Sequence, residues 1–320
     1  MSPTLTNGRR AIGIDFGGTS VKVGVLPDIL AAGAAAPVVL ATQDYGSVGA
    51  LIGAMADAVS DLRQRHDNID AVGCGVPGLV DFDTGHVNHV TNVAGWEDVP
   101  LRDILKAKTG LPVLVDNDAN CMAYAEWRHG AGRGFHNVVA LTLGTGIGGG
   151  LIIDDRLYRG SRHAAGEIGQ MSIDFRGKIG SYGQPGCLES YMGNRQIGGL
   201  AAARLGDRPM PEGGWTPKAV AELAAAGDPA ACDIWIDVAD WLGSVLASIA
   251  WLLNPDAFVI GGGVAKASDL LFKPLERKVR GMVSEVVSDG LRILPAHFGN
   301  EAGIVGSAAQ ALDSCALAPS

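Results

Sequence analysis

Apolar residues form short runs broken by glycine, a pattern that predicts strands joined by tight turns. The segment AIGIDFGGTSVKVGVL, which begins at Ala11, places one apolar run on each side of a Gly-Gly-Thr turn and predicts a hairpin. Residues 137–155, NVVALTLGTGIGGGLIIDD, repeat this arrangement later in the chain. A repeat of this kind indicates two related halves, each with a strand, a glycine turn and a second strand.

The segment between the two hairpins predicts both helices and strands. Residues 50–65 carry apolar side chains at helical spacing, and residues 71–80 predict a strand that runs into a Pro-Gly turn. The run VLV within residues 111–120 is short and fully apolar, which predicts a strand buried on both faces of a central sheet. A helix follows from Ala119 and ends at Gly130.

The last third of the chain is mostly helical. Residues 234–252 repeat apolar side chains every three or four positions and predict one long helix that ends before Asn254-Pro255, because the residue before proline avoids the helical region. Residues 257–265 predict a buried strand followed by three glycines, and residues 303–312 predict a closing helix. We expect an α/β chain of two domains with a cleft between them.

Composition narrows the function classes. Apolar residues make up 47% of the 320 residues and charged residues 18%, so a large core is expected. The net charge of −9 argues against nucleic acid or an anionic membrane as a partner. The start of the chain is polar, and the apolar run at 245–253 is shorter than the roughly 18 residues of a membrane span. Five cysteines without a CxxC motif are typical of reduced thiols, so we expect a cytoplasmic enzyme acting on a small molecule.

The first glycine turn is a candidate phosphate and metal site. Glycines let backbone N–H groups approach phosphate oxygens, and a carboxylate at a strand end can hold Mg²⁺ directly or through water. The residues concerned are Asp15, Gly17, Gly18 and Thr19. An ordinary hairpin with an aspartate at its corner would have the same sequence.

Two later glycine clusters extend this candidate nucleotide site. The second turn contains Gly144, Thr145 and Gly146, and would hold phosphate in the same way. The third cluster would let a flat ring or a ribose approach the backbone, and it comprises Gly261, Gly262 and Gly263. Each cluster alone also fits a simple loop, whereas their order and strand context together favour nucleotide binding.

Asp118 is the candidate general base. It follows the VLV strand, and a carboxylate at a strand tip could take the proton from a hydroxyl as its oxygen attacks phosphorus. The alternative is that Asp118 only caps the helix that begins near Ala119, since aspartate is common at that position. The sequence leaves both roles open.

Taken together, these segments resemble the ROK family (repressors, open reading frames, kinases), and specifically its glucokinase-like sugar kinases. The matches cover nearly the whole chain in family order, and they are DFGGT (15–19), GVPG (75–78), TNVAGW (91–96), NDAN (117–120), LGTGIGGG (143–150), AAGEIG (164–169), GCLE (186–189) and IGGGV (260–264).

The resemblance implies an actin-like (ribonuclease H-like) two-domain ATPase fold with a central cleft in which ATP and sugar meet. It implies a smaller N-terminal domain of residues 1–119 plus 302–320, and a larger C-terminal domain of residues 120–301 that carries the interface of a homodimer. Closure of the domains would exclude water as a competing phosphoryl acceptor.

The resemblance also implies roles for individual residues. Asp118 is the catalytic base, and Asn117 is a sugar ligand. The expected sugar site further comprises Glu167, Glu189, Gly78, Thr91 and Asn92. The residues expected to handle ATP phosphates and Mg²⁺ are Asp15, Gly17, Gly18 and Thr19, with Gly144, Thr145 and Gly146.

The chain departs from the family at the zinc motif that many relatives carry. Gln170 stands at the position of a zinc-binding histidine, and Gly180 and Tyr182 replace two cysteines, so that only Cys187 remains. One thiolate cannot build a tetrahedral zinc site, and no zinc is expected. We expect Tyr182 to pack where the metal would otherwise hold the loop. In relatives the histidine also reaches the sugar, so Gln170 is expected to alter selectivity near carbons 1 and 2.

The leading hypothesis is ATP-dependent phosphorylation of a hexose at its 6-hydroxyl, with glucose as the first candidate in a glycolytic role. Alternative acceptors are N-acetylmannosamine, fructose, allose, another amino sugar or a cyclitol, and polyphosphate is an alternative donor. A ROK transcriptional regulator is disfavoured by the acidic charge and by the short segment before the first strand. A non-catalytic scaffold is disfavoured by Asp118 and the sugar carboxylates.

Overall fold

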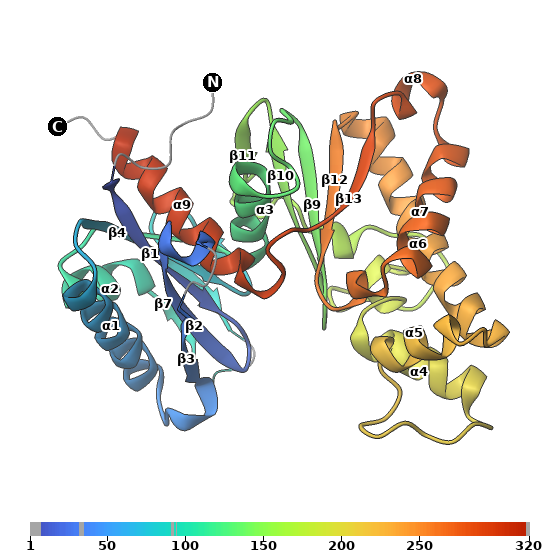
Figure 1. Cartoon of the computed structure of the whole chain (residues 1–320), viewed down its shortest axis with the longest axis horizontal. Coiled ribbons are helices and arrows are strands. Elements are labelled where there is room, and N and C mark those ends of the chain that lie inside the picture. Colours follow the sequence, from blue (N-terminus) through green and yellow to red (C-terminus); the bar gives the residue numbers. More distant parts are fainter. Residues whose placement is uncertain (1–7, 32–34, 91–92, 94, 318–320) are drawn as a thin grey trace. The chain divides into compact units, whose positions relative to one another are not determined.

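The computed structural model describes residues 8–31, 35–90, 93 and 95–317, which form two compact units (Figure 1). Unit 1 comprises Met1–Gly130, Leu157–Ala165 and Asn300–Ser320, and unit 2 comprises Ala131–Arg156 and Gly166–Gly299. The chain therefore first passes from unit 1 to unit 2 after Gly130, whereas the resemblance implied a boundary after residue 119. The segment Leu157–Ala165, which we call the strap, belongs to unit 1 although both of its neighbours in sequence belong to unit 2.

Unit 1 is built on a mixed five-stranded sheet in the order β3-β2-β1-β4-β8. The predicted hairpin is confirmed, because β1 pairs antiparallel with β2, while β1, β4 and β8 are parallel to one another. The bounds are β1 Arg10–Phe16, β2 Ser20–Leu26, β3 Val38–Ala41, α1 Val48–Arg65, β4 Ile69–Val76, α2 Leu101–Thr109, β8 Val113–Asn117, α3 Asp118–His129 and α9 Ala302–Leu317. A small antiparallel sheet that the sequence did not reveal comprises β5 Val80–Asp81, β6 His86–His89 and β7 Glu97–Val99.

Helix α9 approaches the sheet of unit 1 at two glycines. Gly13 in β1 and Gly73 in β4 are register partners. A Cβ atom on these residues would lie 2.0 Å from the carbonyl oxygen of Ile304 and 1.8 Å from that of Ser307, so only glycine allows this approach. The last helix of the chain is thereby packed directly onto its first strand.

Unit 2 has a second five-stranded sheet in the order β11-β10-β9-β12-β13. The bounds are β9 Val138–Leu143, β10 Ile147–Ile153, β11 Arg156–Tyr158, α4 Asn194–Leu205, α5 Pro217–Ala225, α6 Pro229–Leu253, β12 Ala257–Gly261, α7 Asp269–Met282, α8 Glu285–Ser288 and β13 Arg292–Pro295. As in unit 1, an antiparallel hairpin, β9 with β10, is extended by parallel strands, β12 and β13. The shared strand order confirms the two related halves that the repeated glycine hairpins predicted.

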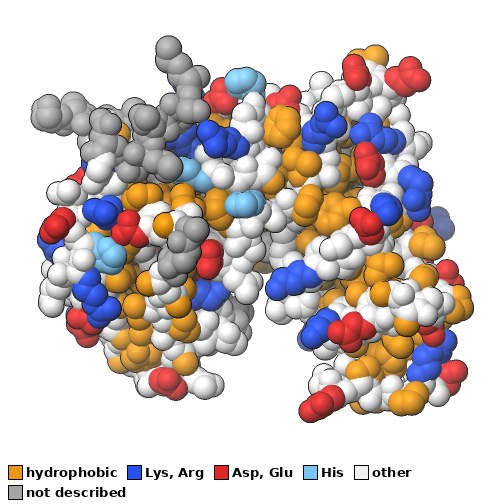
Figure 2. Space-filling view, in the orientation of Figure 1, with side chains coloured by type: hydrophobic (Ala, Val, Ile, Leu, Met, Phe, Trp, Pro, Cys, Tyr) orange, Lys and Arg blue, Asp and Glu red, His pale blue; other side chains and the backbone are white. Residues whose placement is uncertain are grey.

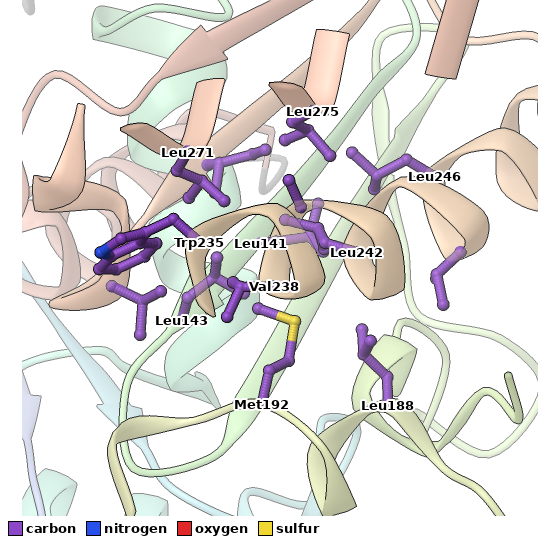
Figure 3. Close-up of a cluster of buried hydrophobic side chains, with 14 of the residues drawn as sticks. Leu141, Leu143, Leu188, Met192, Trp235, Val238, Leu242, Leu246, Leu271 and Leu275 are labelled. Atoms are coloured by element: carbon purple, nitrogen blue, oxygen red, sulfur yellow. The ribbon is translucent and has the colours of Figure 1, made fainter. Parts of the chain in front are cut away.

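The core of unit 2 forms around α6. Its buried face includes Trp235, Val238, Leu242 and Leu246, which pack with side chains of β9 and α7 (Figure 3). By length and composition alone α6 could cross a membrane, but half of its most apolar stretch is buried within the protein. The helix ends as predicted, with Asn254 in the left-handed conformation at φ 44°.

The prediction for the VLV strand is wrong in one respect. β8 is the last strand of its sheet rather than a central one, and Val113 and Leu114 are only half-buried. A three-residue apolar run does not distinguish a central strand from an edge strand, because both can be apolar where a helix covers them. The candidate base therefore follows an edge strand.

Candidate functional site

In unit 1, the predicted residues gather at the carboxyl ends of the parallel strands. Asp15 of β1 is in register with Gly75 of β4, and Val76 of β4 is in register with Asn117 of β8. Because these strands are parallel, the residues that follow them lie along one edge of the sheet. Asn117 Nδ2 donates to the carbonyl oxygen of Gly78 at 3.0 Å, so two predicted sugar residues are in direct contact.

The capping role that competed with catalysis falls to Asn117. Its Oδ1 accepts hydrogen bonds from the N–H groups of Ala119 at 2.9 Å and Asn120 at 3.2 Å, which makes it the N-cap of α3. Asp118 is the first helical residue, and its Oδ1 accepts from Ala119 N at 2.8 Å. A carboxylate in the first turn of a helix is favoured by the helix dipole. The cap is thus provided without making Asp118 the capping residue.

A buried ion pair between Asp116 and Arg159 fixes the end of β8 next to Asn117. Asp116 is 2% exposed, and its Oδ1 accepts from Asn117 N at 2.8 Å and from Asn120 Nδ2 at 3.0 Å. Its Oδ2 accepts from Arg159 Nε at 3.0 Å and Nη2 at 2.8 Å. Sequence reasoning missed Arg159, although an aspartate inside an apolar strand is a signal that a partner must exist.

The first glycine turn carries Asp15 at the end of β1. Burial raises the pKa of the Asp15 carboxyl, and the Lys22 ammonium, with Nζ 3.8 Å from Oδ2, opposes that shift. The turn is closed by Gly17 N donating to the carbonyl oxygen of Ser20 at 2.9 Å, and Thr42 Oγ1 donates to that of Gly18 at 3.3 Å. Thr19 lies at the tip of this turn and is exposed to solvent.

In unit 2, the second and third glycine clusters meet at one sheet edge. β9 and β12 are parallel neighbours, and Gly261 is in register with Thr142. The loop Gly144–Gly146 follows β9, while Gly262 follows β12 with φ +90° and lies against the backbone of Leu143. Gly263, next along the chain, lies beside the side chain of Asn194. The predicted nucleotide residues of this unit are therefore neighbours.

Glu189 binds the second glycine loop directly, which sequence reasoning did not anticipate. Its Oε2 accepts from Ile147 N at 2.8 Å, and a Cβ atom on Gly146 would come within 2.6 Å of the same oxygen. Leu188 and Met192, on either side of Glu189, point into the core toward α6 (Figure 3). This apolar spacing around the GCLE motif was the signal that Glu189 is held in one place.

Two further predicted sugar residues, Glu167 and Gln170, interact with Glu189. Glu167 precedes the short 3-10 helix Ile168–Gln170, and Gln170 Nε2 lies 3.5 Å from Glu189 Oε1. Partial burial, together with the negative charge of Glu189, raises the pKa of Glu167. Gln184, for which the sequence predicted no role, donates from Nε2 to Gln170 Oε1 at 2.6 Å.

At the zinc-motif positions, the structure brings Gly180 close to Cys187. Cys187 is 1% exposed, with Sγ 2.9 Å from Ser190 Oγ, and a Cβ atom on Gly180 would lie 2.5 Å from that sulfur. Position 180 is therefore tightly packed against the Cys187 side chain. Tyr182 is 77% exposed, so the expectation that it packs in place of a metal is wrong.

Within the part of the chain that the structure describes, one group of three side chains is close enough to share a metal ion. It consists of Asp81, Asp83 and His163 in unit 1 and includes no residue of the zinc motif. His163 Nδ1 already accepts a hydrogen bond from Phe82 N at 3.2 Å. The predicted sugar residues Thr91 and Asn92 lie outside the described residues.

Comparison with known proteins gives matches over most of the chain. The family model described as ROK family matches residues 11–314. A glucokinase of Halalkalibacterium halodurans is 35% identical in an alignment of 309 positions that covers 92% of each chain. A glucokinase of Streptomyces coelicolor is 35% identical in an alignment of 312 positions that covers 93% of this chain and 96% of that one.

Among solved structures, a ROK family glucokinase from Streptomyces griseus, in complex with glucose and AMPPNP, is 34% identical. It superimposes with a TM-score of 0.78 over 95% of this chain and 99% of its own. This match confirms the predicted actin-like two-domain ATPase fold.

Proposed function

Because the chain belongs to the ROK family and is similar to glucokinases over more than nine-tenths of its length, we propose that it is an ATP-dependent hexose kinase. The proposed reaction transfers the γ-phosphoryl group of ATP to the 6-hydroxyl of a hexose, with glucose as the first candidate. Its strongest support in the structure is Asp118, a carboxylate in the first turn of α3. The N-cap of this helix is Asn117 and not Asp118.

In this proposal Asp118 removes the proton of the 6-hydroxyl while that oxygen attacks the γ-phosphorus and the bond to the ADP oxygen breaks. Such a base contributes about 10²–10⁴ in rate. Asn117, whose side chain is fixed between Gly78 and α3, presents an amide for hydrogen bonding to a sugar hydroxyl. Glu167, Glu189 and Gln170 add acceptors and a donor for the remaining hydroxyls.

The glycine loops are the proposed nucleotide ligands. Backbone N–H groups around Gly17–Thr19 and Gly144–Gly146 would face phosphate oxygens, and the glycines 261–263 would lie beside the nucleoside. Asp15 retains solvent access at the end of β1 and suits a magnesium ligand, directly or through water. Mg²⁺ bound with ATP would neutralise phosphate charge.

We propose that this chain uses no structural zinc, since Gln170, Gly180 and the exposed Tyr182 do not form a ligand set with Cys187. We also retain the proposals of a cytoplasmic homodimer without nucleic-acid or membrane partners. The net charge of −9 fits the absence of a nucleic-acid partner, and acidic and basic side chains are interspersed on the face drawn in Figure 2.

The test is a coupled assay of ADP release with Mg-ATP over a panel of glucose, N-acetylmannosamine, fructose, allose, an amino sugar and a cyclitol, with a parallel arm that offers polyphosphate as donor. We expect glucose to give the highest kcat/KM, and Asp118→Asn to lower kcat by about 10²–10⁴ with little change in sugar KM. The substitution keeps the size of the side chain, but an amide cannot accept the proton. Absence of turnover on every sugar, or full activity of Asp118→Asn, would refute the proposal.

A further inference from the structure

The loop between Ser172 and Cys187 is closed by backbone contacts around Gln184. Ser172 pairs with Cys187, and Ile179 pairs with Pro185, as isolated antiparallel bridges. Gly180 N donates to the carbonyl oxygen of Gln184 at 2.7 Å. The backbone of Gln184 is thereby fixed, and its side chain is only partly accessible to solvent.

The side chain of Gln184 binds Gln170 twice. Its Nε2 donates to Gln170 Oε1 at 2.6 Å and lies 3.5 Å from the carbonyl oxygen of the same residue. Gln170 Nε2 in turn faces Glu189 Oε1 at 3.5 Å, and Glu189 Oε2 accepts from Ile147 N at 2.8 Å. A chain of hydrogen bonds therefore runs from the loop to the second glycine turn.

The direction of this chain is set by Glu189. An ionised carboxylate only accepts hydrogen bonds, so Gln170 must turn its NH₂ group toward Glu189 and its oxygen toward Gln184. Gln184 must then present its own NH₂ group, which leaves its Oε1 facing away. Gln184 Oε1, which this order of donors and acceptors turns away from Gln170, is buried without a hydrogen-bond partner among the residues described.

We propose that Gln184 is a positioning residue for Glu189, acting through Gln170, and that this pair of amides holds the loop in place of a metal ion. The inference rests on the proposed function for the role of Glu189 in sugar binding. Cys187 and Leu188 are buried in the core and anchor the end of the loop. The side-chain contact between Gln184 and Gln170 joins the rest of the loop to Gln170.

Gln184→Glu is the sharpest test, because it keeps the shape of the side chain and removes its donors. The carboxylate cannot donate to Gln170 Oε1, and turning Gln170 around would place its oxygen against Glu189. We expect the sugar KM to rise about tenfold, as expected when the hydrogen bond from Gln170 to the charged Glu189 is lost, while the ATP KM stays within about twofold. Tyr182→Ala, an exposed change in the same loop, should leave both constants unchanged.

Hydrogen exchange of the sugar-free protein gives a readout that needs no activity. Gln184→Glu should speed exchange in peptides covering residues 172–187, and treatment with a zinc chelator should leave exchange of the wild type unchanged. An unchanged sugar KM and loop exchange in Gln184→Glu would overturn the proposal, as would equal rises in both KM values with lower thermal stability. Faster loop exchange on chelation would show that a metal holds the loop, and would also overturn it.

The two proposals fail in different ways. If the wild type phosphorylates no hexose, the proposed function fails, whereas the exchange measurement still decides whether Gln184 holds the loop.

Discussion

Glu167 and Glu189 place two carboxylates near each other in unit 2, and their charges are coupled. Both partial burial and the charge of Glu189 favour the protonated form of Glu167, so its pKa lies above the usual value of 4.5. Protonation removes an acceptor for a sugar hydroxyl. When both carboxylates are ionised, their repulsion lowers the stability of the folded protein. Such destabilising pairs are common in binding sites.

We expect the sugar KM to increase as the pH falls through the raised pKa of Glu167. The stability of the fold changes in the opposite direction and increases as the pH falls. The contribution of Glu167 to stability is full below the pKa of the unfolded state and is lost as the pH rises through the pKa of the folded state. Glu167→Gln, which cannot titrate, should flatten the dependence of KM on pH and raise the melting temperature at neutral pH. The prediction is wrong if the variant keeps the pH dependence of the wild type.

At the scale of elements, the strap and β8 are joined by the Asp116–Arg159 pair. Arg159 also donates from Nη2 to Gln310 Oε1 of α9 at 2.7 Å, and its guanidinium carbon lies 3.6 Å from the centre of the Phe82 ring. Three parts of unit 1 that are distant in sequence therefore meet at one side chain. The segment that presents Asn117 and Asp118 is fixed by this junction.

Arg159→Met should lower the free energy of unfolding by about 3–5 kcal/mol, because Asp116 would remain as an unpaired buried charge. Chemical denaturation measures this loss. Arg162→Met, an exposed change in the same strap, should cost less than about 0.5 kcal/mol. Adding Asp116→Asn to Arg159→Met should recover part of the stability, since it removes the buried charge. Equal effects of the two arginine variants would contradict this account.

At the scale of the whole molecule, unit 2 exposes apolar side chains near the ends of α6 and α7 and on α8. They are Trp251, Leu252, Met282 and Val286. Trp251 Nε1 donates to the carbonyl oxygen of Met282 at 3.1 Å, so the ends of α6 and α7 are adjacent. Exposed apolar clusters of this kind are typical of interfaces, and we propose that this one pairs with a second copy of the chain.

Sedimentation equilibrium tests the proposed dimer. The wild type should have twice the mass of one chain, and Leu252→Glu should shift it toward the monomer by placing a charge in the interface. Val39→Glu makes the same change at an exposed apolar residue of unit 1 and should leave the dimer intact. A monomeric wild type, or a dimer that survives Leu252→Glu, would exclude this interface.

Much of the fold and some of the site followed from the sequence, because they depend on local rules. The two glycine hairpins, the helix capped by Gly130 and the long helix capped by Asn254 are set by periodicity, turn residues and helix caps. The candidate ligands Asp15, Asp118 and Glu189 were identified by their place in motifs. The edge position of β8 was not predictable, because apolar character reports burial and not strand order.

The tertiary structure alone decided which residues support the site. Arg159 and Asp116 are 43 residues apart, and Glu189 and Ile147 are 42 apart, so no local pattern connects them. Gln184 lies in the loop of the zinc motif, where the sequence pattern marks the positions of metal ligands and gives Gln184 no role. Sequence determines which backbone each segment can form and which side chains carry chemistry. Packing determines which distant donors and acceptors meet, because a buried polar group must find its partner wherever the fold brings one.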